Sequence, residues 1–205
     1  MYYSTIFCLS APTTPSYYQW QFFGSVRCVS ETDTEFLVPA HVQDIAENSC
    51  DPVHFQFVHK MEDVPPSEVT IDADGRTLHL HSDAEQSGVS THLHATVYSP
   101  GFAMVRNTYA PGAEMVMYNS AQPISKHQTL MRWTLTVSRA IEDLAGDDVM
   151  EGIIAGLDDD YPIWANKVHK HRPLFCKEDK SLVMFRKWVR QFYLTSNDKR
   201  AIALA

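Results

Sequence analysis

The chain has 205 residues, of which 44% are hydrophobic and 20% are charged, the composition of an ordinary globular protein. At about 100 to 200 residues per domain, this length predicts one domain with a buried core and argues against two full-sized ones. The 17 Lys and Arg residues face 25 Asp and Glu residues, which gives a net charge of −8. That is the wrong sign for a protein that neutralises nucleic-acid phosphates.

The four cysteines lie far apart and form no C-x-x-C pair, which is typical of a protein in a reducing compartment. No apolar run reaches the length of about 18 residues at which a membrane span is expected, and the N-terminal segment lacks the basic region of a signal peptide. We therefore expect a cytoplasmic chain without a membrane span.

Charge is unevenly distributed along the chain. Ten of the 17 Lys and Arg residues lie between residues 166 and 200 together with only three acids, so the preceding part is strongly acidic. A solvated helix face is the commoner explanation of such a basic segment, and a docking surface for an acidic partner protein is the alternative.

The elements are predicted in chain order as a helix, a run of antiparallel strands and two more helices. Alternating apolar and polar residues predict strands at 67–72, 77–81, 89–98, 103–109, 114–118 and 129–137. Turn signals separate them at Asp74-Gly75, Pro100-Gly101, Pro111-Gly112 and Gln122-Pro123. Helical patterns cover about 42–59, 147–170 and 181–193. This order favours an α+β domain with helices on one face of the sheet.

One carboxylate falls on an apolar helix face. Apolar residues follow one another at 3.6-residue spacing in the 147–170 segment: Ile153, Leu157, Trp164 and Val168. Asp160 lies in the middle of this stripe. A buried carboxylate must be paired, protonated or bound to a metal. The alternative is a helix that breaks at Pro162 and leaves Asp160 as an exposed N-cap residue.

The first helical segment holds possible partners for this carboxylate: Glu47, Asn48, Asp51, His54 and His59. Two imidazoles and one carboxylate would form a facial triad, which leaves positions on ferrous iron open for dioxygen, whereas two histidines with a Glu and water could bind zinc. The spacing does not choose between these metals. His54 and His59 are separated by about 140° around a regular helix, so both reach one metal only if the helix is distorted or ends between them.

A competing cluster consists of two H-x-H pairs, His79 with His81 and His92 with His94. Alternation directs these histidines off one sheet face and the neighbouring leucines off the other: Leu78, Leu80 and Leu93. A cupin-like metal site would use such a pair, but no carboxylate stands at a fitting spacing. We therefore favour a polar sheet face with scattered imidazoles and rank this metal site second.

Residues 43–59 read Q-D-I-A-E-N-S-C-D-P-V-H-F-Q-F-V-H. This run resembles the iron-binding segment of Rieske-type non-haem iron oxygenases, in the branch of the 3-ketosteroid 9α-hydroxylase oxygenase components and cholesterol 7-desaturases. Further motifs of the family follow in the same order. Q-P-I-S at 122–125 matches the family's T-P-I-D, and D-Y-P-I-W-A-N-K at 160–167 matches its D-x-x-I-W-x-x-K. R-P-L at 172–174 and residues 185–193 match the family's R-P-L and its Y-R-R-W-x-x-Q-F-Y ending. The joint order over residues 38–194 is far more specific than any single motif.

This resemblance implies a site and a fold. By it, His54, His59 and Asp160 would hold a mononuclear Fe(II). Asp51 matches the bridging aspartate that links the iron to the Rieske cluster of a neighbouring subunit, and Asn48 matches a position close to the iron, where it would support a ligand. The implied fold is a helix-grip (START/Bet v1-like) domain, a curved antiparallel sheet around a long C-terminal helix with a substrate tunnel between them.

The sequence departs from the family at Ala165, where an acidic residue is usual, at Pro162 in the same segment, and above all in the Rieske motifs. It contains neither C-x-H nor C-x-x-H, the motifs that ligate the Rieske cluster. We therefore expect no iron-sulfur cluster in this chain and a separate electron donor, either a Rieske- or ferredoxin-type protein or another subunit of an oligomer. The sequence is equally compatible with a piece of a longer oxygenase, and both homo- and hetero-oligomers stay open.

The leading hypothesis is an oxidoreductase domain that uses Fe(II) and dioxygen to hydroxylate or desaturate an apolar, steroid-like substrate. Residues 1–37 are expected to be a lead-in that packs on the body, 38–194 the iron domain and 195–205 a tail. Two alternatives stay open: an iron domain that takes its electrons from a co-substrate, and a degenerate subunit that binds a lipid or scaffolds an oligomer. Retention of the two histidines and the aspartate argues against the second.

Overall fold

A seven-stranded antiparallel sheet forms the centre of the fold, in the computed structural model, which describes residues 28–86, 88–145 and 147–193. The strands are β1 (Cys28–Val38), β2 (Ser67–Ile71), β3 (Leu78–Gln86), β4 (Val89–Ser99), β5 (Phe102–Ala110), β6 (Ala113–Ser125) and β7 (Gln128–Ser138). Their order across the sheet is β1-β7-β6-β5-β4-β3-β2. Strands β2 to β7 therefore form one meander, and β1 pairs beside the last of them.

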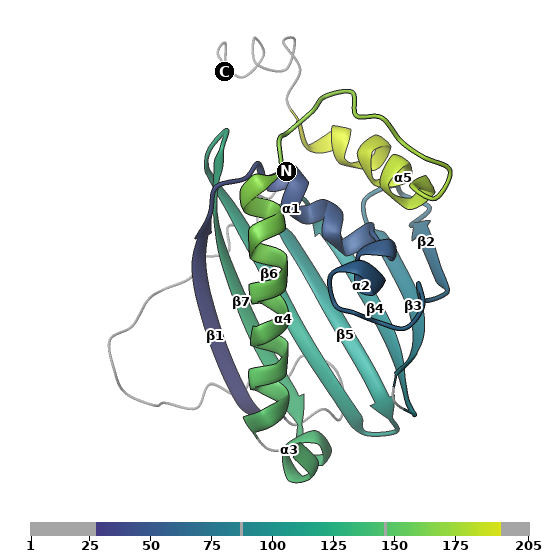
Figure 1. Ribbon diagram of the computed structural model, residues 1–205, viewed down its shortest axis with the longest axis vertical. Helices are drawn as coiled ribbons and strands as arrows, with labels where there is room; N and C mark the ends of the chain where they lie inside the picture. The colour runs from purple at the N-terminus through teal and green to yellow at the C-terminus, as the bar shows by residue number, and fades with distance from the viewer. Residues whose placement is uncertain (1–27, 87, 146, 194–205) are drawn as a thin grey trace.

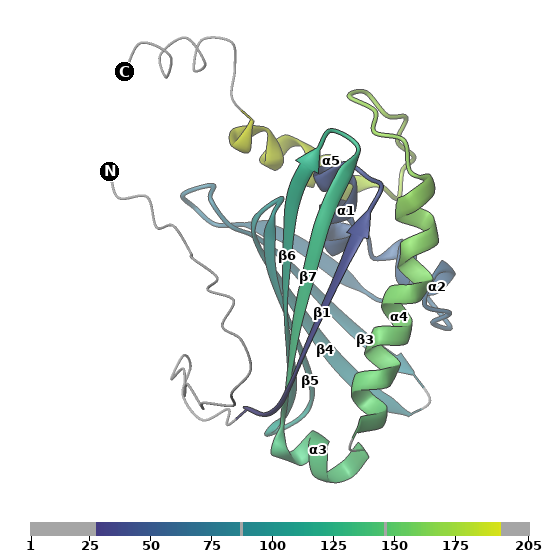
Figure 2. The ribbon, with the colours of Figure 1, turned by 90° about the vertical axis from the view of Figure 1, so that its left-hand side faces the viewer.

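Helices gather on one face of the curved sheet (Figures 1 and 2). They are α1 (Val42–Ala46), the 3-10 helix η1 (Glu47–Cys50), α2 (Val53–Phe57), α3 (Arg139–Ala145), α4 (Asp147–Asn166), α5 (Lys180–Trp188) and the 3-10 helix η2 (Val189–Phe192). The long helix α4 runs across the concave face (Figure 2). This arrangement confirms the predicted α+β helix-grip class. None of the described helices is long and apolar enough to cross a membrane.

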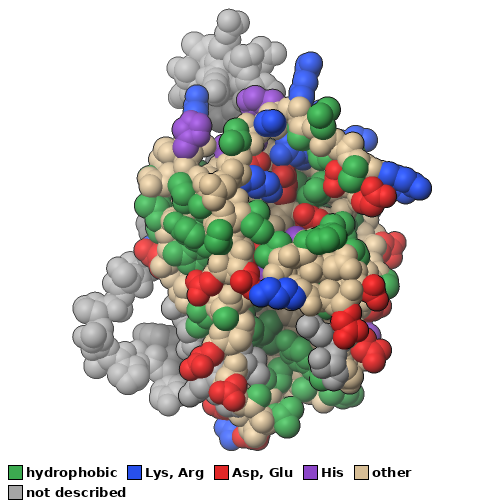
Figure 3. All heavy atoms as spheres, in the orientation of Figure 1, with side chains coloured by type: hydrophobic (Ala, Val, Ile, Leu, Met, Phe, Trp, Pro, Cys, Tyr) green, Lys and Arg blue, Asp and Glu red, His purple; other side chains and the backbone are tan. Residues whose placement is uncertain are grey.

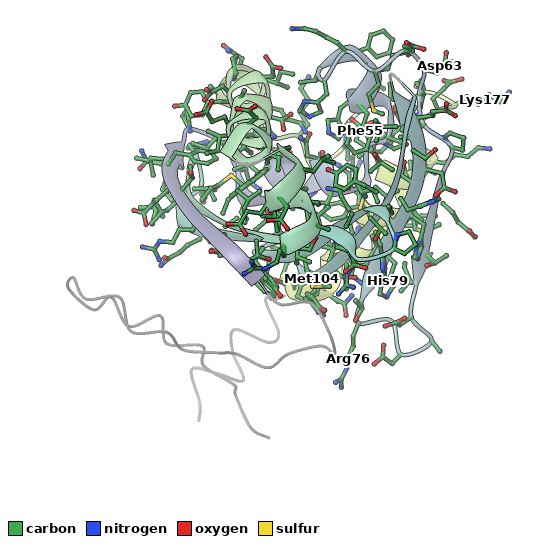
Figure 4. All side chains as sticks on the ribbon, turned by 90° about the horizontal axis from the view of Figure 1, so that it is seen from below. Phe55, Asp63, Arg76, His79, Met104 and Lys177 are labelled. Carbon is green, nitrogen blue, oxygen red and sulfur yellow. The ribbon has the colours of Figure 1, made fainter. Side chains whose placement is uncertain are left out.

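The core lies between the sheet and α4 because the strands turn their apolar residues to that side. Leu78 and Leu80 of β3 are fully buried, while His79 between them points to the opposite face, as the alternation predicted. Figure 4 shows His79 and Met104 on the convex side and Phe55 on the concave side, which also holds α4. Leu157 and Trp164 of α4 pack there against Met131 and Trp133 of β7, among others.

Most predicted strands are present, and the clearest differences concern β1 and β6. Strand β1 was not predicted as a strand; residues 28–37, the described part of the expected lead-in, form most of it. The predicted break at Gln122-Pro123 is wrong, since β6 continues to Ser125. Pro123 has no backbone N–H, and the pairing of β6 with β7 shifts register between Pro123 and Ser125, which accommodates it.

Two of the predicted helices differ from the sequence pattern in extent. The predicted helix over 42–59 is three short pieces, and the last of them, α2, begins after Pro52. The predicted helix over 147–170 ends earlier, at Asn166, so Val168 lies outside it and is 74% exposed instead of joining the apolar stripe. Pro162 does not break α4. The alternative in which Asp160 is an exposed cap residue is therefore wrong.

Candidate metal centre and cavity

Two histidines and one aspartate meet between α2 and α4. His54 belongs to α2, His59 follows that helix, and Asp160 belongs to α4. One ligand atom of each side chain lies within 4.8 Å of the others, and His59 Nε2 is 3.6 Å from Asp160 Oδ2. Because α2 ends at Phe57, the two histidines are freed from regular helical spacing and can face one point. The three side chains could hold a metal ion.

Asp160 is almost completely buried, with 5% of its surface exposed. The Asn48 side-chain amide donates a hydrogen bond of 2.9 Å to its Oδ1 atom. Among the described residues, no Lys or Arg forms an ion pair with it; the titratable groups beside it are the two imidazoles. This buried carboxylate therefore has no Lys or Arg beside it among those residues, and a divalent cation would compensate its charge.

The backbone of the chain holds the ring of His54 in one orientation. Its Nδ1 atom donates a hydrogen bond to the Asp51 carbonyl, so the Nε2 lone pair stays available. Burial lowers the pKa of His54, against the opposing effects of the Asp51 carbonyl and the Asp160 carboxylate. The neutral imidazole that results is the form that binds metals. Asp51 itself accepts a hydrogen bond of 3.1 Å from the Val53 backbone amide.

The three side chains line a cavity of about 470 Å³ between the sheet, α2 and α4. Its walls are mainly apolar side chains of the inner sheet face and α4, including Leu80, Leu93, Val105, Met117 and Leu157. Figure 3 shows the surface hollowed between α4 and α2, with apolar side chains inside the hollow. A cavity of this size and lining is typical of a site for a drug-sized apolar molecule.

A second group of possible ligands lies outside the cavity, at His41, Asp44 and His169. Asp44 is already compensated, because His169 Nδ1 lies 3.0 Å from its Oδ2 atom and the Arg186 guanidinium lies 3.4 Å from its Oδ1 atom. We interpret it as part of an ion-pair network and not as a metal site. Sequence reasoning missed this network. No local pattern predicts it, because the partners of Asp44 lie more than 120 residues away in the sequence.

The four histidines of the H-x-H pairs lie on the outer sheet face. His79 Nδ1 is 3.1 Å from His94 Nε2, and the rings of His81 and His94 stack at 4.1 Å. Carboxylates do accompany them in space, contrary to the expectation from spacing: Asp72 lies 3.2 Å from His79 and Asp83 lies 2.7 Å from His92. Within the described part of the chain, this cluster does not bring three ligand atoms to one point.

Comparison with known proteins supports the resemblance seen in the motifs. The family model for the 3-ketosteroid 9alpha-hydroxylase C-terminal domain matches residues 8–193. A 3-ketosteroid-9-alpha-monooxygenase oxygenase component of Rhodococcus rhodochrous is 23% identical over 180 residues, which cover 78% of this chain and 45% of that protein. The cholesterol 7-desaturase nvd 1 of Ciona intestinalis is 24% identical over 187 residues, covering 78% and 39%. The chain thus spans about half the length, or less, of these relatives.

Solved structures agree with the fold. The structure of Pseudomonas putida CBB5 NdmA with caffeine superposes with a TM-score of 0.65 at 17% identity, covering 78% of this chain and 51% of that one. Dicamba monooxygenase bound to dicamba gives a TM-score of 0.56 at 12% identity, covering 78% and 57%. At these identities the likeness concerns the fold alone. The family match over most of the chain is decisive: the chain belongs to the family of the 3-ketosteroid 9alpha-hydroxylase C-terminal domain.

Proposed function

We propose that this chain is the catalytic domain of a Rieske-type oxygenase, which binds one Fe(II) ion through His54, His59 and Asp160 and uses dioxygen to hydroxylate or desaturate an apolar, steroid-like substrate. One observation carries the proposal: two imidazoles and a buried carboxylate without a compensating cation converge in the wall of a large apolar cavity. A binding pocket for an apolar molecule alone would gain nothing from that carboxylate.

The donor set fits mononuclear non-haem iron. Two imidazoles and one carboxylate on one side of a metal leave further positions open, which is the arrangement of Fe(II) oxygenases. Iron, when bound, would supply the activation of dioxygen. The chain's own residues would do the positioning: Asn48 holds the carboxylate of Asp160, and the Asp51 carbonyl holds the ring of His54. The apolar walls would exclude water from the reacting C–H group.

The substrate class follows from the cavity and the relatives together. The relatives are named for a 3-ketosteroid and for cholesterol, both large apolar molecules with few polar groups. The cavity wall is mainly apolar and its volume lies within the range of about 300–1,000 Å³ common for drug-sized ligands. Hydroxylation and desaturation both begin from the same oxidant, so the geometry supports either outcome.

Electrons would enter from a Rieske or ferredoxin centre that this sequence does not encode. Asp51 is suited to the route, because its backbone carbonyl contacts His54 directly while its side chain is only half-buried. The segment between α4 and α5 exposes the apolar Val168 and Leu174 among the exposed cations Lys170, Arg172 and Lys177. We propose that an acidic electron donor, as a separate protein or subunit, binds there.

Anaerobic Fe(II) titration of the purified chain tests the metal site. The wild type is expected to bind one Fe(II) per chain, and Asp160→Ala is expected to bind none at the same site. Asp159→Ala is the matched control, since Asp159 is the preceding residue of α4 and is exposed. It should bind iron as the wild type does.

The outcomes separate the rival functions. Iron binding that depends on Asp160 supports the oxygenase. Oxygen consumption with Fe(II), substrate and a reducing co-substrate, but without an electron-donor protein, would favour an iron domain that takes electrons from a co-substrate. Absence of specific binding, or binding indifferent to Asp160, would refute the metal site. A cavity-binding or scaffolding subunit would then be the better account of the same fold.

A further inference from the structure

Two polar side chains stand side by side on one wall of the apolar cavity. Asn107 and Tyr109 are two residues apart on β5, so they project from the same face of the sheet, and both line the cavity. Their neighbour on that strand face, Val105, is apolar, as is Leu93, which pairs with Asn107 from β4. The polar pair is thus set into a mainly apolar wall, whose other polar residues include Thr91 of β4 and Asn119 of β6.

Neither side chain has a partner within the described parts of the chain. The Asn107 amide and the Tyr109 hydroxyl make no side-chain hydrogen bond there, although both are partly buried. Burial raises the pKa of Tyr109, so its hydroxyl keeps its proton and can donate as well as accept. Polar groups in a partly buried site are normally satisfied, and groups that face a cavity are available to a ligand.

The pair lies at a distance from the metal centre along α4. Tyr109 packs against the cluster of Met115, Leu135, Val137 and Ile141, and so does Ile153 of α4. Ile153 precedes Asp160 by seven residues, which is about 10 Å along a helix. A rigid apolar molecule could therefore lie with one end at the polar pair while a C–H group near its other end faces the metal centre.

The cavity wall also sets the charge of the group that fits. No Lys or Arg is among the described residues that line the cavity. A carboxylate or sulfate on the ligand would be buried without a counter-charge, at a high free-energy cost. A neutral oxygen, by contrast, can accept from the Asn107 amide and can also exchange a hydrogen bond with the Tyr109 hydroxyl.

We propose that Asn107 and Tyr109 determine substrate specificity by binding a neutral oxygen function, a ketone or a hydroxyl, at the end of the substrate remote from the metal centre. The inference rests on the proposed function and adds to it the polar group by which the substrate is oriented. A steroid oxygenated at one end of its ring system would then enter the cavity in one direction only.

Equilibrium dialysis tests this with three steroids that differ in a single group: androstane, androstanol and androstanone, the last two with their oxygen on ring A. The purified chain is used without dioxygen or electron donor, so no turnover occurs. The wild type is expected to bind the two oxygenated steroids about tenfold more tightly than androstane, the gain from one or two net hydrogen bonds. Comparison of androstanol with androstanone shows which oxygen the pair prefers.

The variants Tyr109→Phe and Asn107→Leu, singly and combined, keep most of the volume of each side chain. The double variant should lower the preference to within about twofold, while androstane binds as before, which shows that the cavity is intact. Asn119→Leu is the matched control, because Asn119 also lines the cavity but lies on β6 opposite Trp133. It should keep the preference.

Two results would overturn the assignment. A double variant that still prefers oxygenated steroids, or an Asn119→Leu variant that loses the preference equally, would refute the role of the pair and leave the proposed oxygenase function untouched. Failure of the wild type to bind any of the three steroids would refute this inference together with the steroid-like substrate of the proposed function.

Discussion

Two regions of this protein bury a carboxylate next to histidines, and they differ in what compensates the negative charge. Asp44, in α1, is 1% exposed, and Asp160, in α4, is 5% exposed. Around Asp44 the structure provides cationic side chains. Around Asp160 it provides an amide donor and two imidazoles. Cationic side chains therefore compensate the buried charge of Asp44, and no Lys or Arg among the described residues does so for Asp160.

The charge of Asp44 is compensated by an ion-pair network between α1, η1 and the C-terminal part of the chain. Arg186 of α5 lies 2.6 Å from a Glu47 carboxylate oxygen and 3.4 Å from Asp44. Lys167 lies 3.5 Å from Glu47, and its amino group donates to the Asp44 carbonyl at 2.8 Å. This network joins α1 and η1, which precede the candidate metal ligands in the chain, to helix α5.

Asp160 is informative because of this contrast with Asp44. The chain supplies Arg and Lys to buried acids only a few residues away from Asn48, and yet none of the described Lys and Arg residues pairs with Asp160. A cation from solution would complete the charge balance there and would be repelled at the Asp44 network, where Arg186 and Lys167 already stand. The comparison thus distinguishes an acid held by ion pairs from a candidate metal ligand, and the following predictions test it.

The largest effect is expected from replacing Arg186, the cation beside Asp44 and Glu47. Arg186→Met would leave Asp44 and Glu47 buried with too little positive charge, which should lower the free energy of unfolding by about 3–5 kcal/mol. Urea denaturation measures this change. Lys187→Met, the exposed neighbour in α5, is the control and should change stability by less than about 0.5 kcal/mol. Equal losses in both variants would contradict the network's role.

An intermediate effect of opposite sign is expected at Asp160. Without metal, Asp160→Asn should keep or raise the free energy of unfolding, because it removes an uncompensated charge while the new amide oxygen still accepts from Asn48. At a concentration of Fe(II) one hundred times the dissociation constant, the wild type should gain about 3 kcal/mol and the variant nothing. Anaerobic urea denaturation with and without Fe(II) measures both. A metal-free variant markedly less stable than the wild type would place Asp160 with the structural acids.

The smallest effect concerns the dependence of stability on pH in the compensated region. Burial, and next the neighbouring His169, lower the pKa of His41, partly offset by Asp44. Because the unfolded state then binds the proton more readily, the stabilisation is complete above about pH 6.5 and is lost as the pH falls below it. Protonation would also remove the acceptor Nδ1 that caps α1 through the Gln43 amide.

The free energy of unfolding, measured between pH 7 and pH 5, should therefore fall less in His41→Asn than in the wild type. His127→Asn is the control, since His127 is exposed in the turn between β6 and β7. Its pH profile should match that of the wild type. An unchanged slope in His41→Asn would mean that other groups account for the acid sensitivity.

Much of the candidate site was accessible to sequence analysis because its signals are local. The apolar spacing around Asp160 showed a carboxylate on a buried helix face, and the motif at residues 43–59 showed which histidines to consider. The alternative of a helix break at Pro162 was wrong, although the local preference of proline favours such a break. Packing of Leu157 and Trp164 against the sheet outweighs the hydrogen bond that the proline removes, and α4 continues.

By itself, the sequence determined the fold class, the family and the residues from which a metal site could be built, because periodicity and ordered motifs are properties of neighbouring residues. Only the tertiary structure decided which of them meet. Asn48 reaches Asp160 across 112 positions, and Arg186 reaches Asp44 across 142. It also decided that Asn107 and Tyr109 face a cavity and have no side-chain hydrogen-bond partner among the described residues. Such contacts depend on how the sheet curves around α4, and no local pattern encodes that curvature.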